Sequence, residues 1–322
     1  MSNPFRGLSR LKSVLVGAVS LVILCSLVGF ILEPRFEAAD LRRFPAPGEL
    51  IQVGDHRLHL NCQGSGSPTV VIDAGAGDWS ASWAVVQREI AELTKVCTYD
   101  RAGYGWSEPA PGPMTARQSA GELHALLERA GVPGPFVLAG HSAGGLTVRL
   151  FAHNYPEEVA GVVFIDSMTP DEHASGSGEQ VRSGRSILES ILPSLARLGF
   201  MRALSVPLTM VKVLPGTQSQ IASSVTPRFF SAVQDEYLGL SGSLAQASKV
   251  RSLGDLPVIV LSASLGNDAT WQKKQTSLLG LSTSSEQMFA EHSGHNIQED
   301  QPQAAIAAIS KMAGQIRSEG SR

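Results

Sequence analysis

A serine between two glycines is the feature of this chain with the clearest chemistry. The segment Gly140–Gly144 reads Gly-x-Ser-x-Gly, with the apolar run Phe136–Ala139 before it and a helix-compatible stretch after it. This order predicts a sharp turn between a buried strand and a helix, which presents the hydroxyl of Ser142 at the end of the strand. A Cβ at either glycine would collide across so tight a turn. Ser142 is therefore the candidate nucleophile, although three fixed positions also match by chance in turns with an incidental serine.

A serine hydroxyl is a weak nucleophile near neutral pH and needs a base within hydrogen-bond reach. We favour His295, because it lies in a glycine-containing loop beyond the last predicted strand, where it can reach over Ser142. His292 is the nearest alternative, and the other histidines are less suitable. They are His56 and His59 on an early strand, His124 and His153 on helices, His173 in an insertion, and His141, which we expect to point away across the turn.

Short apolar runs alternate with helical stretches on both sides of this serine. Runs of this kind interleaved with helices predict a mostly parallel sheet that is covered on both faces. The expected strands are His56–Cys62, Thr69–Asp73, Lys95–Tyr99, Phe136–Ala139, Val159–Asp166, Leu256–Leu261 and Glu286–Ala290. The expected helices are Trp83–Leu93, one from the capping box at Thr115 to Gly131, Leu146–Asn154, Trp271–Leu279 and Pro302–Ile316.

The alternation breaks between about residues 169 and 253. Ser175–Gly184 is rich in glycine and serine, and Ile187–Leu214 is strongly apolar with leucines at helical spacing. We expect a mostly helical cap inserted over the carboxyl edge of the sheet, where ligands bind in open α/β sheets.

The N-terminal residues 1–34 form a separate segment. Ser13–Leu32 contains no charged residue and matches the ~20 residues that cross a hydrocarbon core. We favour an uncleaved membrane anchor over a cleaved signal peptide or a soluble core helix, since cleaved signals usually have shorter apolar cores. The flanking charges favour an inside N-terminus and an exported body, with residues 35–49 as a linker and 50–322 as the catalytic domain. These flanking residues are Arg6, Arg10 and Lys12 before the segment and Glu33, Glu37 and Asp40 after it.

Composition argues against several other classes of protein. The chain has 322 residues, a net charge of −3 and no basic stripe with interleaved aromatic residues, which gives no electrostatic case for binding nucleic acid. His292 and His295 lack the further ligands that a metal site needs, so no metal is expected. Gly75-x-Gly77 lacks the third glycine and the following acid of a dinucleotide-binding loop, so no cofactor is expected.

Four motifs together resemble the α/β-hydrolase superfamily. They are Asp73-Ala74-Gly75-Ala76-Gly77, the run from Asp100-Arg101 to Trp106-Ser107, Gly140–Gly145, and Ser293-Gly294-His295 followed by Pro302. The resemblance covers about Leu50 to Ile316 and is specific to the superfamily but weak on substrate. It implies an eight-stranded, mostly parallel sheet in the order 1-2-4-3-5-6-7-8, with helices on both faces and a helical cap.

The resemblance also implies an acid that accepts the Nδ1 proton of the histidine. The usual family position follows the seventh strand, where Asp268 stands about two residues late. The alternative position ends the sixth strand, where this chain has Asp166. We favour Asp166, because an unpaired carboxylate directly after an apolar strand is costly unless it has a role. A simple cap for the next segment is the other reading of Asp166.

The family's oxyanion hole implies two backbone N–H donors, at Ala143 and at Ala76 in the loop after the third strand. Ala74 stands where the family often has histidine, but a backbone donor should survive that departure. Ser142 also distinguishes the chain from haloalkane dehalogenases and epoxide hydrolases, which use an aspartate nucleophile.

The implied strand order makes the strands of Cys62 and Cys97 neighbours. A disulfide is then sterically plausible and fits an exported domain, while two free buried thiols remain the alternative. Cys25 lies in the apolar N-terminal segment and is expected to be only a small hydrophobe.

These residues lead us to expect a membrane-tethered serine hydrolase that cleaves carboxylic esters, with a preference for hydrophobic substrates suggested by the apolar insertion. Thioesterase, amidase, C–C hydrolase and perhydrolase reactions stay open, because the same triad serves them all. A non-catalytic ligand-binding module on this fold is the alternative of a different class.

Overall fold

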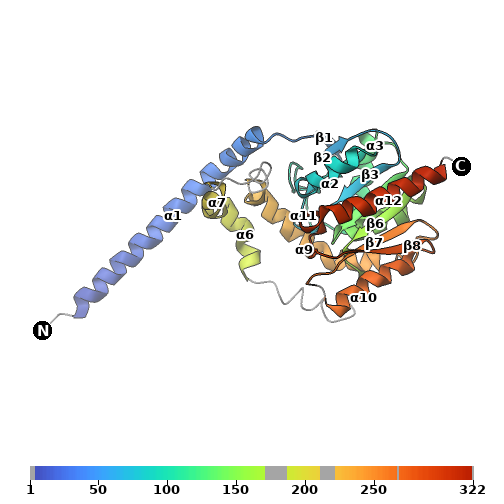
Figure 1. Ribbon diagram of the computed structural model, residues 1–322. Coiled ribbons are helices and arrows are strands. Elements are labelled where there is room, and N and C mark those ends of the chain that lie inside the picture. The colour runs from blue at the N-terminus through green and yellow to red at the C-terminus, as the bar shows by residue number, and fades with distance from the viewer. Residues whose placement is uncertain (1–3, 171–186, 211–221, 267, 321–322) are drawn as a thin grey trace. The chain divides into compact units, whose positions relative to one another are not determined.

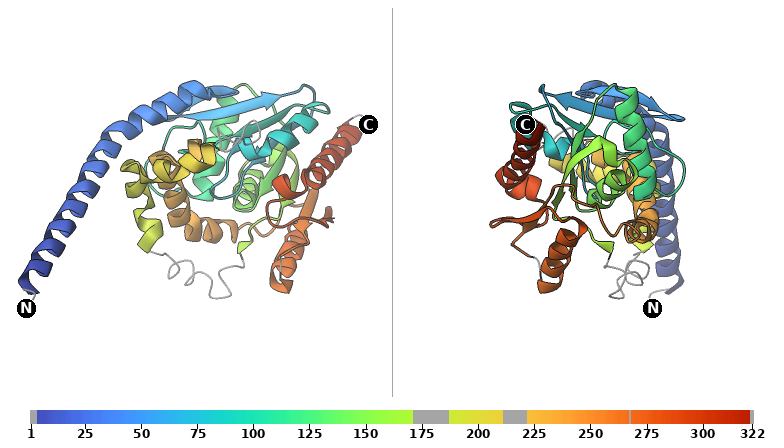
Figure 2. Two further views of the ribbon diagram at one scale, coloured as in Figure 1. Left: turned by 60° about the vertical axis from the view of Figure 1, so that its left-hand side comes forward. Right: turned by 90° about the vertical axis from the view of Figure 1, so that its right-hand side faces the viewer.

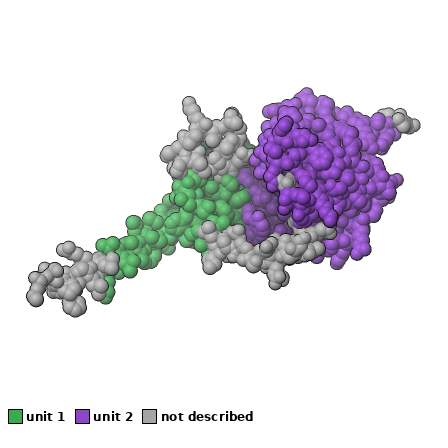
Figure 3. Space-filling view, turned by 60° about the horizontal axis from the view of Figure 1, so that its bottom comes forward, with its two compact units in different colours: residues 1–45, 187–230 green, residues 46–186, 231–322 purple. Residues whose placement is uncertain are grey.

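The computed structural model describes residues 4–170, 187–210, 222–266 and 268–320. It divides into two compact units, which Figure 3 colours separately. Unit 1 comprises Met1–Pro45 and Ile187–Phe230, and unit 2 comprises Ala46–Ser186 and Ser231–Arg322. Ser175–Gly184 and His173, which we assigned to the cap, lie outside the described residues.

Unit 2 contains an eight-stranded sheet in the order β1-β2-β4-β3-β5-β6-β7-β8 (Figure 1). β2 pairs antiparallel with β1 and β4, and the remaining neighbours are parallel. The predicted fold class and strand order are therefore confirmed. The strands are β1 (Glu49–Val53), β2 (His56–Gln63), β3 (Thr69–Asp73), β4 (Val96–Tyr99), β5 (Phe136–His141), β6 (Val159–Ile165), β7 (Val258–Ala263) and β8 (Ser285–Ala290).

Helices cover both faces of this sheet, as the views in Figures 1 and 2 show. Successive strand residues point to opposite faces, so Val70 and Ile72 of β3 join a core with α2 (Ala84–Ala91) and α12 (Pro302–Gly320). The opposite face carries α3 (Ala116–Arg129) and α4 (Gly144–Asn154), where Phe136 and Phe151 meet edge to face. Shorter elements complete the unit: η1 (Ser80–Trp83), η2 (Pro156–Glu158), α10 (Ala269–Ser277), η4 (Leu278–Leu281) and α11 (Ile297–Asp300).

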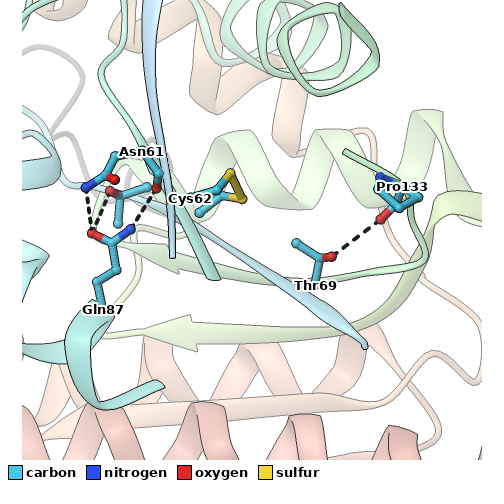
Figure 4. The surroundings of a disulfide bond; sticks show 7 residues. Asn61, Cys62, Thr69, Gln87 and Pro133 are labelled. Atoms are coloured by element: carbon cyan, nitrogen blue, oxygen red, sulfur yellow. Dashed lines mark hydrogen bonds between the residues drawn. A yellow bond between two sulfur atoms is a disulfide. The ribbon is translucent and has the colours of Figure 1, made fainter. Parts of the chain in front are cut away.

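Cys62 and Cys97 face each other across β2 and β4 and form a disulfide (Figure 4). The side chain of Gln87 lies beside it, donating to the carbonyl of Asn61 at 2.7 Å and accepting from the Asn61 amide at 3.2 Å. The predicted adjacency of the two cysteine strands is confirmed, and the disulfide ties the antiparallel edge of the sheet to its parallel centre.

The expected cap over residues 169–253 lies partly outside the described residues and stays a prediction. Helix α9 (Pro227–Ala247) passes from unit 1 into unit 2 after Phe230. One face of its second half is buried, where Gly239 packs directly on the backbone of Met114 and Ser243 accepts the N–H of Ala116 at 2.8 Å. These polar and backbone contacts make the end of the insertion part of the hydrolase-like unit.

Unit 1 is helical in its described part, with α1 (Pro4–Arg43), α6 (Ile187–Arg197) and α7 (Phe200–Met210). α1 continues to Arg43, so most of the expected linker 35–49 is helix. Pro34 removes one backbone donor, but the alanines, leucine and arginines that follow it favour helix strongly enough to continue. Over Lys12–Arg43 this helix is long and apolar enough to cross a bilayer, a property shared by membrane anchors and signal sequences.

Candidate active site

Ser142 occupies the predicted sharp turn between β5 and α4. Its φ of 49° lies in the left-handed region, which a residue other than glycine adopts only under constraint. The turn fits only glycine on both sides: a Cβ on Gly140 would lie 2.6 Å from Val148 Cγ2, and one on Gly144 would lie 2.5 Å from the carbonyl oxygen of Asp73. The strand and helix therefore cross so closely that the serine side chain is forced out at the strand's end.

The structure brings Ser142, His295 and Asp166 together, although 153 residues separate the first two in sequence. Nε2 of His295 lies 2.9 Å from Ser142 Oγ, and Nδ1 lies 2.7 Å from Asp166 Oδ2. A carboxylate on Nδ1 fixes the proton there and leaves Nε2 to accept the serine hydroxyl proton. The His295 side chain is 42% exposed, whereas Asp166 is fully buried.

Asp166 is held by more than the histidine. It follows β6 with a φ of 40°, and its Oδ1 accepts hydrogen bonds from the N–H of Ala263 at 3.1 Å and the indole N–H of Trp271 at 3.0 Å. Asp268, our alternative acid, instead caps α10 by accepting the backbone N–H of Trp271 at 2.8 Å. Of the two aspartates weighed from the sequence, only Asp166 reaches His295.

His141 has a contact that the sequence did not suggest. We expected its ring to point away across the turn, but Nε2 lies 2.9 Å from the carbonyl oxygen of His295. Burial, followed by the nearby His295, lowers the pKa of His141 to about 4, so the ring is neutral at pH 7 and donates from Nε2. This bond holds the backbone of the loop that carries His295. The only sequence signal for it was the position of His141 next to the serine.

The two predicted oxyanion donors lie on either side of the serine. Ala143 begins α4, and the loop containing Ala76 passes so close that a Cβ on Gly75 would lie 3.2 Å from Ser142 Cβ. In the described part of the chain, neither the N–H of Ala76 nor that of Ala143 has a hydrogen-bond partner. Two donors next to a serine hydroxyl are what a developing oxyanion requires.

Arg101 forms hydrogen bonds to the backbone of the loop that carries Ala76. Its guanidinium donates to the carbonyls of Ala74 at 2.7 Å and Gly75 at 2.5 Å, and pairs with Asp73 at 2.5 Å. The same group pairs at 3.1 Å with Glu236, a residue of α9 that had no signal in the sequence. The second oxygen of Glu236 accepts from Tyr104 at 2.5 Å and from the N–H of Gly77 at 3.2 Å. Buried charge and paired hydrogen bonds thus fix both ends of the loop.

Two of the other described histidines have side-chain partners away from Ser142. His59 pairs with the buried carboxylate of Asp100 at 2.9 Å, and His124 stacks on Tyr155. The exposed His292 receives a contact only to its backbone N–H, from Gln301, among the bonds of the described chain. Within the described ranges, no group of three or more histidine, cysteine or acidic side chains is placed to hold a metal ion.

Comparison with known proteins agrees with this architecture. A family model described as "alpha/beta hydrolase fold" matches residues 68–302. The Bacillus subtilis (strain 168) protein YqjL is 28% identical over 254 residues, which cover 77% of this chain and 84% of that protein. "Probable transporter efuK" from Hormonema carpetanum is 35% identical over 128 residues, which cover 37% of this chain and 18% of that much longer protein.

Two solved structures share the fold. A thermophilic esterase from Thermogutta terrifontis superposes with a TM-score of 0.60 and 20% identity, covering 83% of this chain and 97% of that one. The epoxide hydrolase CorEH gives a TM-score of 0.64 and 20% identity, with 83% and 98% covered.

Proposed function

The chain belongs to the alpha/beta hydrolase fold family, and we propose that it is a serine hydrolase that cleaves carboxylic esters. The observation that carries the proposal is the unbroken hydrogen-bonded chain from Ser142 Oγ through His295 to Asp166. The residue at the turn is a serine, so the covalent intermediate would be an acyl-serine rather than an alkyl-aspartate.

The reaction would begin with attack of Ser142 Oγ on the ester carbonyl carbon, while Nε2 of His295 takes the hydroxyl proton. The carbonyl oxygen becomes an oxyanion that the N–H groups of Ala76 and Ala143 can stabilise. Collapse of this intermediate breaks the bond to the alcohol oxygen, which leaves with the proton from His295. Water then attacks the acyl-serine while His295 takes its proton. Collapse of the second intermediate releases the carboxylic acid and returns the proton to Ser142.

Asp166 would stabilise the imidazolium that forms twice in each cycle. Its full burial favours this role, because a carboxylate in a dry site interacts more strongly with a nearby cation. The donors at Ala263 and Trp271 offset the cost of burying its charge.

The setting of the reaction is the second part of the proposal. We assign α1 as an uncleaved anchor that tethers an exported catalytic domain, in keeping with the disulfide, which forms in oxidising compartments. The apolar character of α6 favours hydrophobic esters as substrates.

The experiment is a comparison of the full-length protein with Ser142→Ala and His295→Gln in detergent. Wild-type protein should release a burst of p-nitrophenol from p-nitrophenyl esters and become labelled by a fluorophosphonate on the peptide that contains Ser142. Both variants should lose turnover by about 10³-fold or more. If all three proteins are equally inert across acyl lengths and to the label, a ligand-binding module is the better description.

A further inference from the structure

Unit 1 exposes large apolar side chains on α1, α6 and α7. On α1, the exposed large apolar side chains between Val14 and Ile31 leave 46–68% of their surface open. Elsewhere in this unit, Ile191 of α6 is 41% exposed and Leu204 of α7 is 71% exposed. The run of exposed apolar side chains along α1 is extensive enough to mark contact with a partner or a membrane.

The turn between α6 and α7 sits directly on α1. A Cβ on Gly29 would collide with the backbone carbonyl of Leu198, and one on Gly199 would lie 3.2 Å from Gly29 Cα. Gly199 ends α6 with a φ of 77°, so the chain reverses there and α7 begins at once. Figures 1 and 2 show α6 and α7 beside α1. The face of α1 that carries Gly29 is therefore covered by this turn.

The depth of that contact follows from helix geometry. The uncharged stretch Ser13–Leu32 is about 30 Å long at ~1.5 Å per residue, which is the thickness of a hydrocarbon core. Gly29 lies three residues before its end, roughly 5 Å inside the boundary. If α1 spans a bilayer, the turn at Leu198–Gly199 must lie at the level where acyl chains meet headgroups.

The charges of unit 1 lie just beyond that level and are paired with one another. Glu33 is 2% exposed and accepts from Nε and Nη2 of Arg202 at 2.8–3.1 Å, while Asp40 accepts from Nη1 of the same arginine at 2.5 Å. Arg228 pairs with Glu37 at 3.3 Å. Glu33, Glu37 and Asp40 recur on one face of α1, the face that continues from Gly29. Acids neutralised in this way tolerate a boundary of low dielectric, which unpaired carboxylates would not.

We infer that α1, α6 and α7 form one lipid-facing surface, in which the α6–α7 hairpin lies in the boundary layer of the outer leaflet with Leu204 and Ile191 against acyl chains. The exposed Arg197, at the end of α6, is then level with the polar headgroups, where the charged end of a long side chain is favourable. The inference requires the anchor but not the ester chemistry, so loss of the proposed activity would leave it standing.

The test places a single nitrobenzoxadiazole probe on the full chain in phospholipid nanodiscs. Cys25→Ser removes the exposed free thiol of α1, and the Cys62–Cys97 disulfide does not react with the probe when it is kept oxidised. Probes are attached at Leu204→Cys on the hairpin, at Leu21→Cys inside the apolar stretch, and at Lys273→Cys as an exposed control on unit 2. These side chains are exposed, so the substitutions should not disturb folding.

Lipids that carry a nitroxide near the headgroup end of the acyl chain should quench the Leu204 probe at least about twofold more than the Lys273 probe, and aqueous iodide should quench it less. The Leu21 probe should respond most to nitroxides near the bilayer centre. Quenching of the Leu204 probe by iodide and not by lipid nitroxides would overturn the inference, as would shielding from both quenchers, which would indicate a second copy of the chain on this surface. A Leu21 probe that iodide reaches would overturn it by removing the span.

Discussion

The indole N–H of Trp271 donates a hydrogen bond of 3.0 Å to Oδ1 of Asp166, the carboxylate whose other oxygen binds His295. Trp271 also places its ring edge-on to the histidine, with the ring centroids 5.6 Å apart. One side chain thus orients the proposed acid and borders the proposed base.

Trp271→Phe should lower kcat for ester hydrolysis by about tenfold and leave KM nearly unchanged. A hydrogen bond to a charged group contributes about 1.5–3 kcal/mol, and this one acts on the acid rather than on bound substrate. Steady-state kinetics on the soluble p-nitrophenyl ester would measure it. Wild-type kcat in a folded Trp271→Phe protein would contradict a positioning role for the indole.

Asp166→Asn should reduce kcat by about 10²–10⁴-fold, because the asparagine cannot stabilise the imidazolium and favours the wrong tautomer. Asp268→Asn is the matched control: asparagine caps helices as well as aspartate, so activity and stability should both stay close to wild type. The assignment of Asp166 as the acid is wrong if only the second substitution abolishes turnover.

Arg101→Lys should lower kcat by about 10–100-fold with little change in KM. A lysine ammonium cannot hold the carbonyls of Ala74 and Gly75 together with Glu236, so the Ala76 N–H would lose its fixed direction toward the oxyanion. Arg57→Lys, at the exposed ion pair with Glu108, is the control and should leave both constants unchanged. Circular dichroism of both variants separates misdirection from unfolding, and an equal rise in KM at unchanged kcat would refute the oxyanion role.

His141 makes stability depend on pH. Its folded pKa of about 4 is below the ordinary value of 6.5, so the neutral ring stabilises the fold above pH 6.5, and this contribution is lost as the pH falls toward 4. The full loss is on the order of 3 kcal/mol. His141→Gln keeps a donor for the carbonyl of His295 but cannot titrate, so it should flatten this dependence.

The measurement is urea unfolding of wild type and His141→Gln at pH 7 and pH 5, compared as a difference between the two proteins. The two proteins must be compared because another group also titrates in this range. Burial raises the pKa of Asp78 to about 6, so its protonated form stabilises the fold at low pH, and this contribution is lost as the pH rises through 6. Identical pH dependence in the two proteins would show that His141 does not titrate as its burial implies.

Removal of the Cys62–Cys97 disulfide by paired alanine substitution should lower the free energy of unfolding by about 3–4 kcal/mol. The reason is that the disulfide closes a loop of 35 residues and so restricts the unfolded chain. Unfolding with and without a reducing agent would check this. The reductant should reproduce the effect in wild type and change nothing in the double variant.

The sequence alone was sufficient for the local parts of this protein. Apolar runs between turn residues located seven of the strands. The two glycines around Ser142 identified the sharp turn. Both features depend on residues that are neighbours in the sequence, so the sequence was enough to find them. The resemblance added the strand order, from which the adjacency of Cys62 and Cys97 followed.

Only the tertiary structure decided the contacts between distant segments. The sequence favoured Asp166 over Asp268 but left both open. In the folded chain Asp268 caps α10 by accepting the backbone N–H of Trp271, whereas Asp166 accepts the indole N–H of Trp271 and contacts His295. Glu236 and His141 gave no useful signal, because their roles depend on which backbone groups the packed chain brings within 3 Å or so of them. The ion pairs of α1 are a similar case: its acids contact Arg202 and Arg228, which lie more than 160 residues away and which the sequence did not connect with them.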